Sequence, residues 1–116
     1  MPNNEKFFRS CDLAGVYLIR NKAKGKVYIG SSRDVISRIK GHETALRFHK
    51  HQNKEMQADY DAGNCFFYEF LYVQPIKDGR KIREKLYRLE RDYIEKYNSI
   101  EKGYNSLPVS KTAHNL

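Results

Sequence analysis

The sequence has no apolar run of the length that a membrane-spanning helix needs, which is about 20 residues, because charged residues interrupt every apolar stretch. Met1 leads directly into a polar segment instead of the apolar core of a signal peptide. These two absences argue against a membrane or secreted protein. We therefore expect the chain to lie in the cytoplasm.

Cysteine is also scarce, with two residues at Cys11 and Cys65. They show no Cys-x-x-Cys spacing and no clustered histidines beside them, so neither a zinc site nor a disulfide framework is predicted. We expect both side chains to be reduced thiols.

Acidic residues are outnumbered by basic ones, 14 against 22, which gives a net charge of +8 over 116 residues. This length suits one domain with a modest core. The positive charge favours a polyanionic partner, with nucleic acid ahead of an anionic membrane surface, for which no amphipathic anchor is seen. We predict an N-terminal arm at 1–13, one domain at 14–106 and a flexible tail at 107–116.

Two β-prone runs, 15–20 and 26–30, are separated by a polar stretch in which Gly25 supplies the backbone freedom of a hairpin turn. Tyr17 and Tyr28 lie on these adjacent strands, where their phenol groups can come together at one edge of a small sheet. The alternative is an aromatic pair that only packs.

A helix is predicted after the run 31–34, whose Ser-x-x-Asp pattern is typical of a helix start. Its core face is formed by apolar residues at helical spacing, at Val35, Ile39 and Leu46. His42 falls within that face, and Arg38 lies one turn before it, so both can converge on one anion. The alternative is a solvated arginine beside a core histidine.

The rest of the chain predicts a short helix at 56–60, a strand at 65–73 and a long helix at 80–98. Since the run 65–73 is apolar on both faces, it predicts a buried central strand. The fold class is therefore α+β, with a small three-stranded antiparallel sheet, made of a hairpin and that buried strand, flanked by helices.

Glu90 interrupts the apolar face of the last predicted helix, whereas Glu84 and Glu95 point outward. A buried carboxylate is costly without a partner, so we expect a cation, a metal ion or a hydrogen-bond network beside it. An ion pair with Arg38 or with a nearby lysine is the structural alternative.

The sequences Gly-Val-Tyr at 15–17 and Tyr-Ile-Gly at 28–30 resemble the signature of the GIY-YIG nuclease family. The resemblance extends over about residues 15 to 105, and the runs 26–34 and 102–105 are most similar to the phage and intron homing branch. Repair-type members carry a lysine where this chain has Ser31. The matched positions are Gly15, Gly30, Tyr17, Tyr28, Arg38, His42, Glu90 and Asn105.

The resemblance implies a metal-dependent DNA endonuclease that hydrolyses phosphodiester bonds, with one active site per chain and weak intrinsic sequence specificity. Mg²⁺ is the expected cofactor, with Mn²⁺ as a substitute, and double-stranded DNA is the expected partner. We expect no membrane association, and a monomer or a DNA-induced dimer. The competing interpretations are a non-catalytic basic nucleic-acid-binding module on the same fold and a small RNA-binding protein.

The resemblance also implies roles for individual residues. Glu90 would hold the metal ion and Arg38 would clamp the phosphate. Tyr17 would act as general base, with its pKa lowered by the metal, Lys26 and Arg38. Tyr28 would hold water or a phosphate oxygen, or exchange roles with Tyr17, because the sequence does not assign the two uniquely. His42 would relay a proton or donate to phosphate. The residues expected to contact DNA are Lys26, Arg33, Arg38, His51 and Asn105, the last also holding the backbone of the site.

Overall fold

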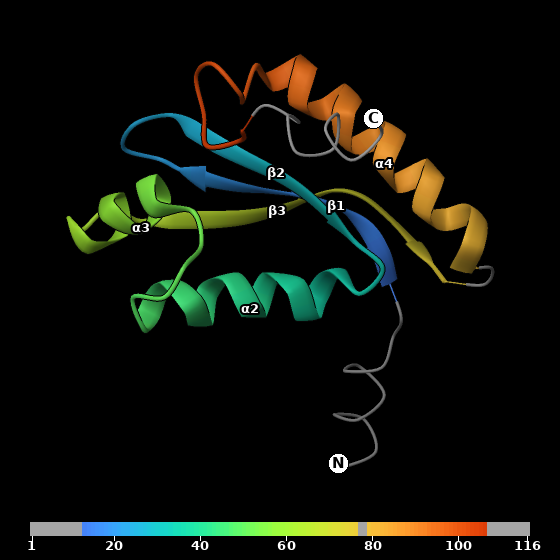
Figure 1. Cartoon of the computed structure of the whole chain (residues 1–116), viewed down its shortest axis with the longest axis horizontal. Coiled ribbons are helices and arrows are strands. Elements are labelled where there is room, and N and C mark those ends of the chain that lie inside the picture. The colour runs from blue at the N-terminus through green and yellow to red at the C-terminus, as the bar shows by residue number, and fades with distance from the viewer. Residues whose placement is uncertain (1–12, 77–78, 107–116) are drawn as a thin grey trace, which may run out of the picture.

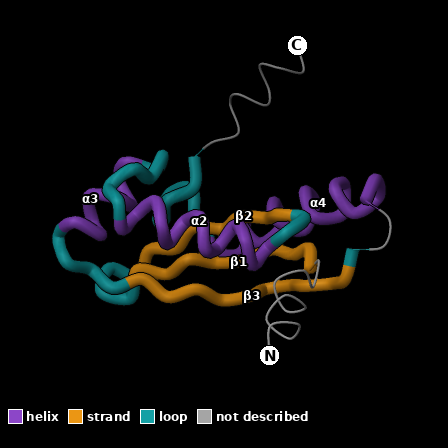
Figure 2. Tube along the Cα trace, turned by 90° about the horizontal axis from the view of Figure 1, so that it is seen from below, coloured by secondary structure: helices purple, strands orange, loops and turns teal. Residues whose placement is uncertain are grey.

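In the computed structural model, which describes residues 13–76 and 79–106, a small sheet lies between helices on its two faces (Figure 1). The helices α2 and α3 cover one face and α4 covers the other (Figures 1 and 2). The elements are β1 Leu13–Asn21, β2 Lys26–Ser32, α2 Val35–Arg47, α3 Lys54–Asp61, β3 Phe66–Pro75 and α4 Gly79–Tyr97. No helix in the described ranges could span a bilayer.

The sheet is antiparallel, with the strand order β2-β1-β3. The predicted hairpin of β1 and β2 is confirmed, and Gly25 occupies its turn with a φ of 70°. The long helix expected at 80–98 corresponds to α4, and the short helix expected at 56–60 corresponds to α3.

The prediction that the apolar run 65–73 forms the central strand is wrong, because β1 is central and β3 is an edge strand. Phe67 is 48% exposed and Phe70 is 54% exposed. The helices α2 and α4 pack mainly on β1 and β2, so β3 has one unpaired edge and incompletely covered faces. The apolar run therefore reflects β-propensity and partial burial, not coverage on both sides.

Side chains of β1 alternate between two hydrophobic clusters, as the period of a strand requires. Val16 and Leu18 face α4, where they pack with Leu86. Tyr17 and Ile19 face the opposite side, in a cluster formed with α2, α3 and the C-terminal loop. This alternation directs Tyr17 toward α2.

Two glycines in the hairpin allow close approaches that any side chain would block. Gly30 pairs with Tyr17 across the strands, and a Cβ on Gly30 would overlap the Tyr17 phenol. A Cβ on Gly15 would overlap the carbonyl oxygen of Tyr72 in β3. Gly30 therefore makes room for a site side chain, and Gly15 makes room for the neighbouring strand.

The start of α2 is set by Asp34, whose carboxylate accepts a hydrogen bond from the Ser37 amide at 3.2 Å. The predicted arm and tail lie outside the described residues, except that Leu13 already pairs with Pro75 in the sheet.

Candidate active site

Tyr17 and Tyr28 lie on the same face of the hairpin. Tyr17 pairs with Gly30 and Ile19 pairs with Tyr28, so the two tyrosines are diagonal neighbours on adjacent strands. Their ring centroids are 6.4 Å apart. The hairpin thus brings the two phenols together, as their positions in the sequence predict.

His42 reaches the two tyrosines from α2. It is only 8% exposed, because it lies on the core face of the helix between buried Val35 and Leu46. Its Nε2 lies 2.6 Å from the Tyr17 hydroxyl oxygen. The imidazole centroid is 5.4 Å from the Tyr17 ring and 5.5 Å from the Tyr28 ring.

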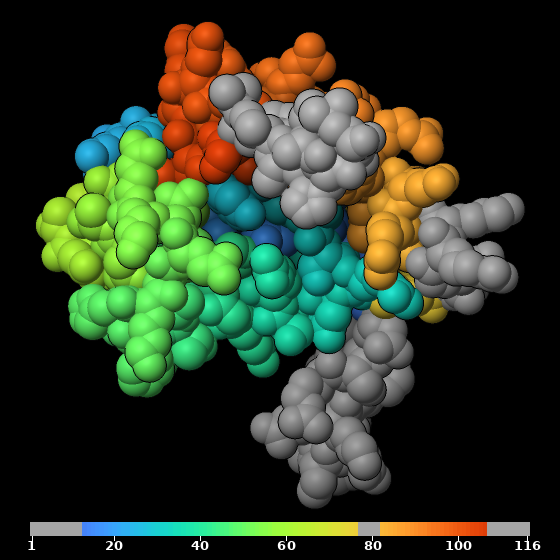
Figure 3. Space-filling view, in the orientation of Figure 1, coloured from blue at the N-terminus to red at the C-terminus, as the bar shows by residue number. Residues whose placement is uncertain are grey.

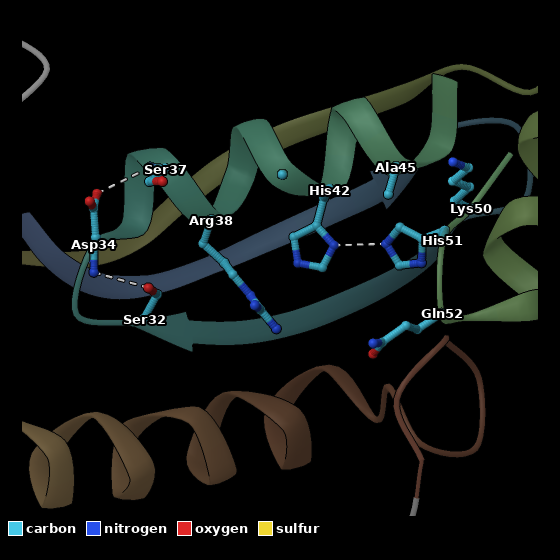
Figure 4. Close-up of a pocket in the computed structure, with 10 residues that line it drawn as sticks. Ser32, Asp34, Ser37, Arg38, His42, Ala45, Lys50, His51 and Gln52 are labelled. Carbon is cyan, nitrogen blue, oxygen red and sulfur yellow. Dashed lines mark hydrogen bonds between the residues drawn. The ribbon is translucent and has the colours of Figure 1, made fainter. Parts of the chain in front are cut away.

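Arg38 lies one turn before His42 on the exposed margin of α2, and its side chain extends from the helix toward β2 (Figure 4). Its positive charge acts on the pKa of Tyr17, of Tyr28 and of Glu90, lowering each against the effect of burial. The guanidinium is therefore within electrostatic reach of both phenols and of the carboxylate.

Glu90 approaches from the opposite face of the sheet, on α4. The Ser31 hydroxyl, in β2, donates a hydrogen bond of 2.6 Å to Glu90 Oε1. Burial raises the pKa of Glu90, and Ser31 and Arg38 partly offset that effect. Of the partners expected for this carboxylate, the structure provides a hydrogen bond, donated by a hydroxyl. Among the described residues Glu90 forms no ion pair with Arg38 or a lysine.

These side chains meet around the outer strand β2. The two tyrosines, His42 and Arg38 lie on its α2 side, and Ser31 and Glu90 lie on its α4 side. On the α2 side a cavity runs beside the helix, lined by Arg38, His42 and His51 among others (Figure 4). The space-filling view, which looks onto the β2 edge of the sheet, shows a hollow between α2 and the loop that follows α4, with parts of β1 and β2 at its floor (Figure 3).

Arg38 lowers the pKa of Tyr17 as expected, but its effect is smaller than that of burial, so the net shift is upward. Burial raises the pKa of Tyr17, the nearby Tyr28 phenol adds to this, and Arg38 opposes it without reversing it. Burial likewise raises the pKa of Tyr28, and the charge of Glu90 adds to it. Both phenols are therefore protonated at neutral pH.

The imidazoles show the opposite shift, because burial disfavours their charged form. Burial, followed by the neighbouring His51 and Arg38, lowers the pKa of His42 to about 4. Burial and then Arg38 also lower the pKa of His51. Both histidines are neutral at physiological pH, and the Nδ1 atom of His42 lies 2.8 Å from Nε2 of His51.

Of the residues expected to contact DNA, Arg33 is exposed in the turn between β2 and α2, next to the site. The Lys26 ammonium instead pairs with Glu55 and lies 4.7 Å from the centre of the Tyr104 ring. It is not among the groups that shift the pKa of Tyr17.

Asn105 holds the outer edge of β2. Its Oδ1 accepts from the Ile29 amide at 2.8 Å, and its Nδ2 donates to the Ile29 carbonyl at 2.9 Å. The Ser99 hydroxyl also donates to Asn105 Oδ1, at 2.7 Å. The Asn105 side-chain amide thus pairs with the backbone of β2 as a neighbouring strand would.

Glu90 is the acidic member of this group of side chains, and the described residues hold no cluster of three or more potential ligands among His, Cys, Asp and Glu. A single carboxylate is compatible with Mg²⁺, which keeps several waters and takes further oxygen ligands from a phosphate. The donors at the site, a carboxylate and the Ser31 hydroxyl beside it, are hard oxygens of the kind that this ion prefers.

Two contributions to the site were not predicted from the sequence. Ser31 was noted only as a departure from a family pattern, although the alternation along β2 could have placed it toward the helix that carries Glu90. Asn53, whose amide contacts His51, gives no signal in the sequence beyond its role as the cap of a helix.

Comparison with known proteins agrees with this geometry. Residues 13–105 match the family described as the GIY-YIG catalytic domain. The chain is 30% identical to intron-associated endonuclease 1 of Enterobacteria phage T4 over 93 aligned residues. The aligned segment makes up 79% of this chain but 36% of that protein. The chain therefore spans only part of this relative's length.

Two solved structures are similar to the chain along most of its length. The catalytic domain of the homing endonuclease I-TevI matches with a TM-score of 0.69 and 28% identity, covering 81% of this chain and 98% of that one. A mutant of the catalytic domain of intron endonuclease I-TevI matches with a TM-score of 0.67 and 29% identity, covering 80% and 92%.

Proposed function

Because this chain belongs to the GIY-YIG endonuclease family, we propose that it is a metal-dependent endonuclease that hydrolyses phosphodiester bonds of double-stranded DNA. The observation that carries the proposal is the convergence of two phenols, a guanidinium and a half-buried carboxylate around β2. Phosphodiester hydrolysis needs a base, cations on the phosphate and stabilisation of the leaving oxygen, and this set supplies the side chains for those tasks.

Glu90 would hold Mg²⁺, or Mn²⁺ in its place, with Ser31 fixing the orientation of the carboxylate. When bound, the ion would polarise the phosphate and stabilise the charge that develops on its oxygens. Since one carboxylate binds such an ion weakly, its occupancy would depend on the DNA phosphate.

Arg38 would clamp a non-bridging phosphate oxygen, because a guanidinium offers two parallel N–H donors and is always charged. Tyr17 would serve as general base toward the attacking water. Its raised pKa means that the phenolate is rare at rest, and the Arg38 charge favours that form. Tyr28 would hold the water or a phosphate oxygen, and His42 would support Tyr17 through the contact between them.

Arg33, Arg38 and Lys26 would contact the DNA backbone, with Lys26 exchanging its Glu55 partner for a phosphate. Asn105 would be a further DNA contact, acting mainly by holding the edge of β2. Both ring nitrogens of His51 are engaged, with the Asn53 amide and with His42, so His51 would support His42 instead of contacting DNA. Phosphate contacts give affinity without reading bases, so intrinsic sequence specificity would be weak. One active site per chain implies a monomer that nicks one strand, or a dimer that forms on DNA. Such a substrate would be met in the cytoplasm, that of the host cell if the protein is encoded by a phage.

The test is incubation of the protein with supercoiled plasmid and Mg²⁺ or Mn²⁺, with and without a chelator. Relaxed or linear product that the chelator prevents is the expected result. Binding of the plasmid without cleavage under either metal would contradict catalysis and favour a non-catalytic DNA-binding module. Tighter binding of single-stranded RNA than of duplex DNA would favour an RNA-binding protein.

A further inference from the structure

A continuous chain of hydrogen bonds leads from the backbone of the loop before α3 to the Tyr17 hydroxyl. The Asn53 amide donates to Nδ1 of His51 at 3.0 Å. Nε2 of His51 lies 2.8 Å from Nδ1 of His42, and Nε2 of His42 lies 2.6 Å from the Tyr17 oxygen. The bond between the two imidazoles is visible in Figure 4.

The first donor in this chain has a fixed direction. A backbone N–H can only donate, so Nδ1 of His51 must accept and carries no proton. A neutral His51 then carries its proton on Nε2 and donates it to Nδ1 of His42. His42, also neutral, must carry its own proton on Nε2 and donate it to the Tyr17 oxygen.

The donor itself is held by the surrounding loop. Asn53 caps α3, because its side chain accepts from the Met56 amide at 3.0 Å and donates to the carbonyl of Tyr104 at 2.8 Å. The backbone amide of His51 donates to the Gln57 side chain at 2.9 Å. The orientation of the Asn53 N–H is thus determined by the helix cap and not by the catalytic side chains.

We infer that His51 and the Asn53 amide are positioning groups that fix His42 in the Nε2–H tautomer, so that His42 donates a hydrogen bond to Tyr17 instead of accepting one. The Tyr17 proton is then directed away from His42. His42 cannot take up that proton, because its Nε2 is already protonated. Its N–H instead stabilises the Tyr17 oxygen as negative charge develops there.

This inference rests on the proposed function for its catalytic meaning, but the tautomers can be measured without any cleavage. Histidine side-chain ¹⁵N chemical shifts of the full chain at neutral pH separate the protonated ring nitrogen from the unprotonated one. The expected result is protonated Nε2 and unprotonated Nδ1 in both His42 and His51. A protonated Nδ1 in His42 would overturn the inference, even if the protein cleaves DNA. Absence of cleavage with the expected tautomers would instead contradict the proposed nuclease.

Two substitutions of His51 separate positioning from a merely structural role. His51→Gln retains an N–H that can donate to His42, and should keep the Nε2–H tautomer and most of the cleavage rate. His51→Ala removes that donor, and should admit the Nδ1–H tautomer and slow cleavage about 10- to 100-fold, as is typical for the loss of a group that orients another.

The matched control is His49→Ala, since the His49 side chain is exposed and contacts Asp61 in α3 instead of His42. It should change neither the His42 shifts nor the cleavage rate. Thermal melting of each variant shows whether it folds. If folded His51→Ala and His51→Gln had equal His42 tautomer populations and equal cleavage rates, the inference would be overturned. Loss of DNA binding in both variants with an unchanged His42 tautomer would overturn it as well.

Discussion

Glu90 carries the negative charge among the five side chains proposed as catalytic, and its neighbourhood disfavours that charge. Burial raises its pKa, while the Ser31 hydroxyl and the Arg38 charge only partly compensate. A folded protein that keeps a carboxylate in such a place loses stability by doing so, which is typical of a group retained for function.

Glu90→Gln tests this role with little change in shape. Glutamine keeps an oxygen that can accept from Ser31 but loses the charge, so cleavage should fall by about 100-fold or more while DNA binding persists. The variant should melt at the same temperature as the original protein or higher, since a charge disfavoured by burial is removed. Plasmid cleavage and thermal melting check both points. Glu84→Gln, at an exposed position on the same helix, should be neutral in both measurements. A fully active Glu90→Gln would remove this residue from the mechanism.

The two tyrosines make different contacts, and this difference predicts unequal effects. The Tyr17 hydroxyl lies against His42 and is almost fully buried, while Tyr28 is partly exposed at the outer strand. Tyr17→Phe should reduce the single-turnover rate by about 100- to 10,000-fold, the range for loss of a general base. Tyr28→Phe should cost less. Rates near that of the original protein in both variants would exclude a phenol as the base, whereas a larger loss for Tyr28→Phe would exchange the two roles.

At the scale of elements, short-range signals in the sequence predict most of the fold. The β1–β2 hairpin follows from alternating residues around a glycine turn, and α4 follows from its apolar face. The position of β3 could not be predicted in the same way, because apolar residues on both faces do not reveal which strand pairs on both edges. The tyrosines and Glu90 were predictable as members of a family pattern. The Ser31–Glu90 bond joins residues 59 positions apart, and only the packing of α4 against β2 brings them together.

The geometry of the hairpin explains why Gly30, the second glycine of the motif, lacks a side chain, and this predicts the effect of a substitution on stability. A Cβ on Gly30 would collide with the Tyr17 phenol, and that ring is packed in the core between the sheet and α2. Gly30→Ala should therefore destabilise the protein by about 1–3 kcal/mol, and should also lower the cleavage rate by displacing Tyr17. Denaturant unfolding measures the first effect.

Gly41→Ala is the matched control, because Gly41 is exposed in α2 and an added Cβ there meets no atom within 4 Å. Alanine is the better helix former, so this variant should be more stable by roughly 0.5–1 kcal/mol. If both variants had the same free energy of unfolding, the proposed collision at Gly30 would be ruled out.

At the scale of the whole molecule, the net charge of +8 should set the affinity of the proposed nuclease for DNA. Each phosphate contact releases condensed counterions, so the logarithm of the binding constant should fall linearly with the logarithm of salt concentration. Arg33→Ala should reduce that slope by about one unit, because Arg33 is exposed beside the site and would lose one phosphate contact. Fluorescence anisotropy on a labelled duplex at several salt concentrations measures the slope. An unchanged slope would place Arg33 outside the DNA interface.

The buried histidines should also make global stability depend on pH. The pKa of His42 falls from 6.5 to about 4 on folding, because burial and then the neighbouring His51 and Arg38 disfavour its charged form. Between these two values the unfolded chain binds a proton that the folded protein does not. Stability is therefore lost as pH falls from 6.5 toward 4, with a slope of at most about 1.4 kcal/mol per pH unit for one such group.

Glu90 acts in the opposite sense, since its raised pKa means that the folded state binds a proton more readily than the unfolded chain. The measured slope of the free energy of unfolding against pH is thus the difference between the histidine and Glu90 contributions. The substitution His42→Gln isolates the contribution of His42. Free energies of unfolding from urea titrations at pH 7, 6, 5 and 4.5 should decline less steeply for His42→Gln than for the original protein. The two curves should converge as the pH falls, because the original protein loses the histidine contribution and the variant has none to lose. Parallel curves over this range would mean that His42 is protonated equally readily in the folded and unfolded states, and that the contacts of its ring with Tyr17 and His51 do not exclude the imidazolium.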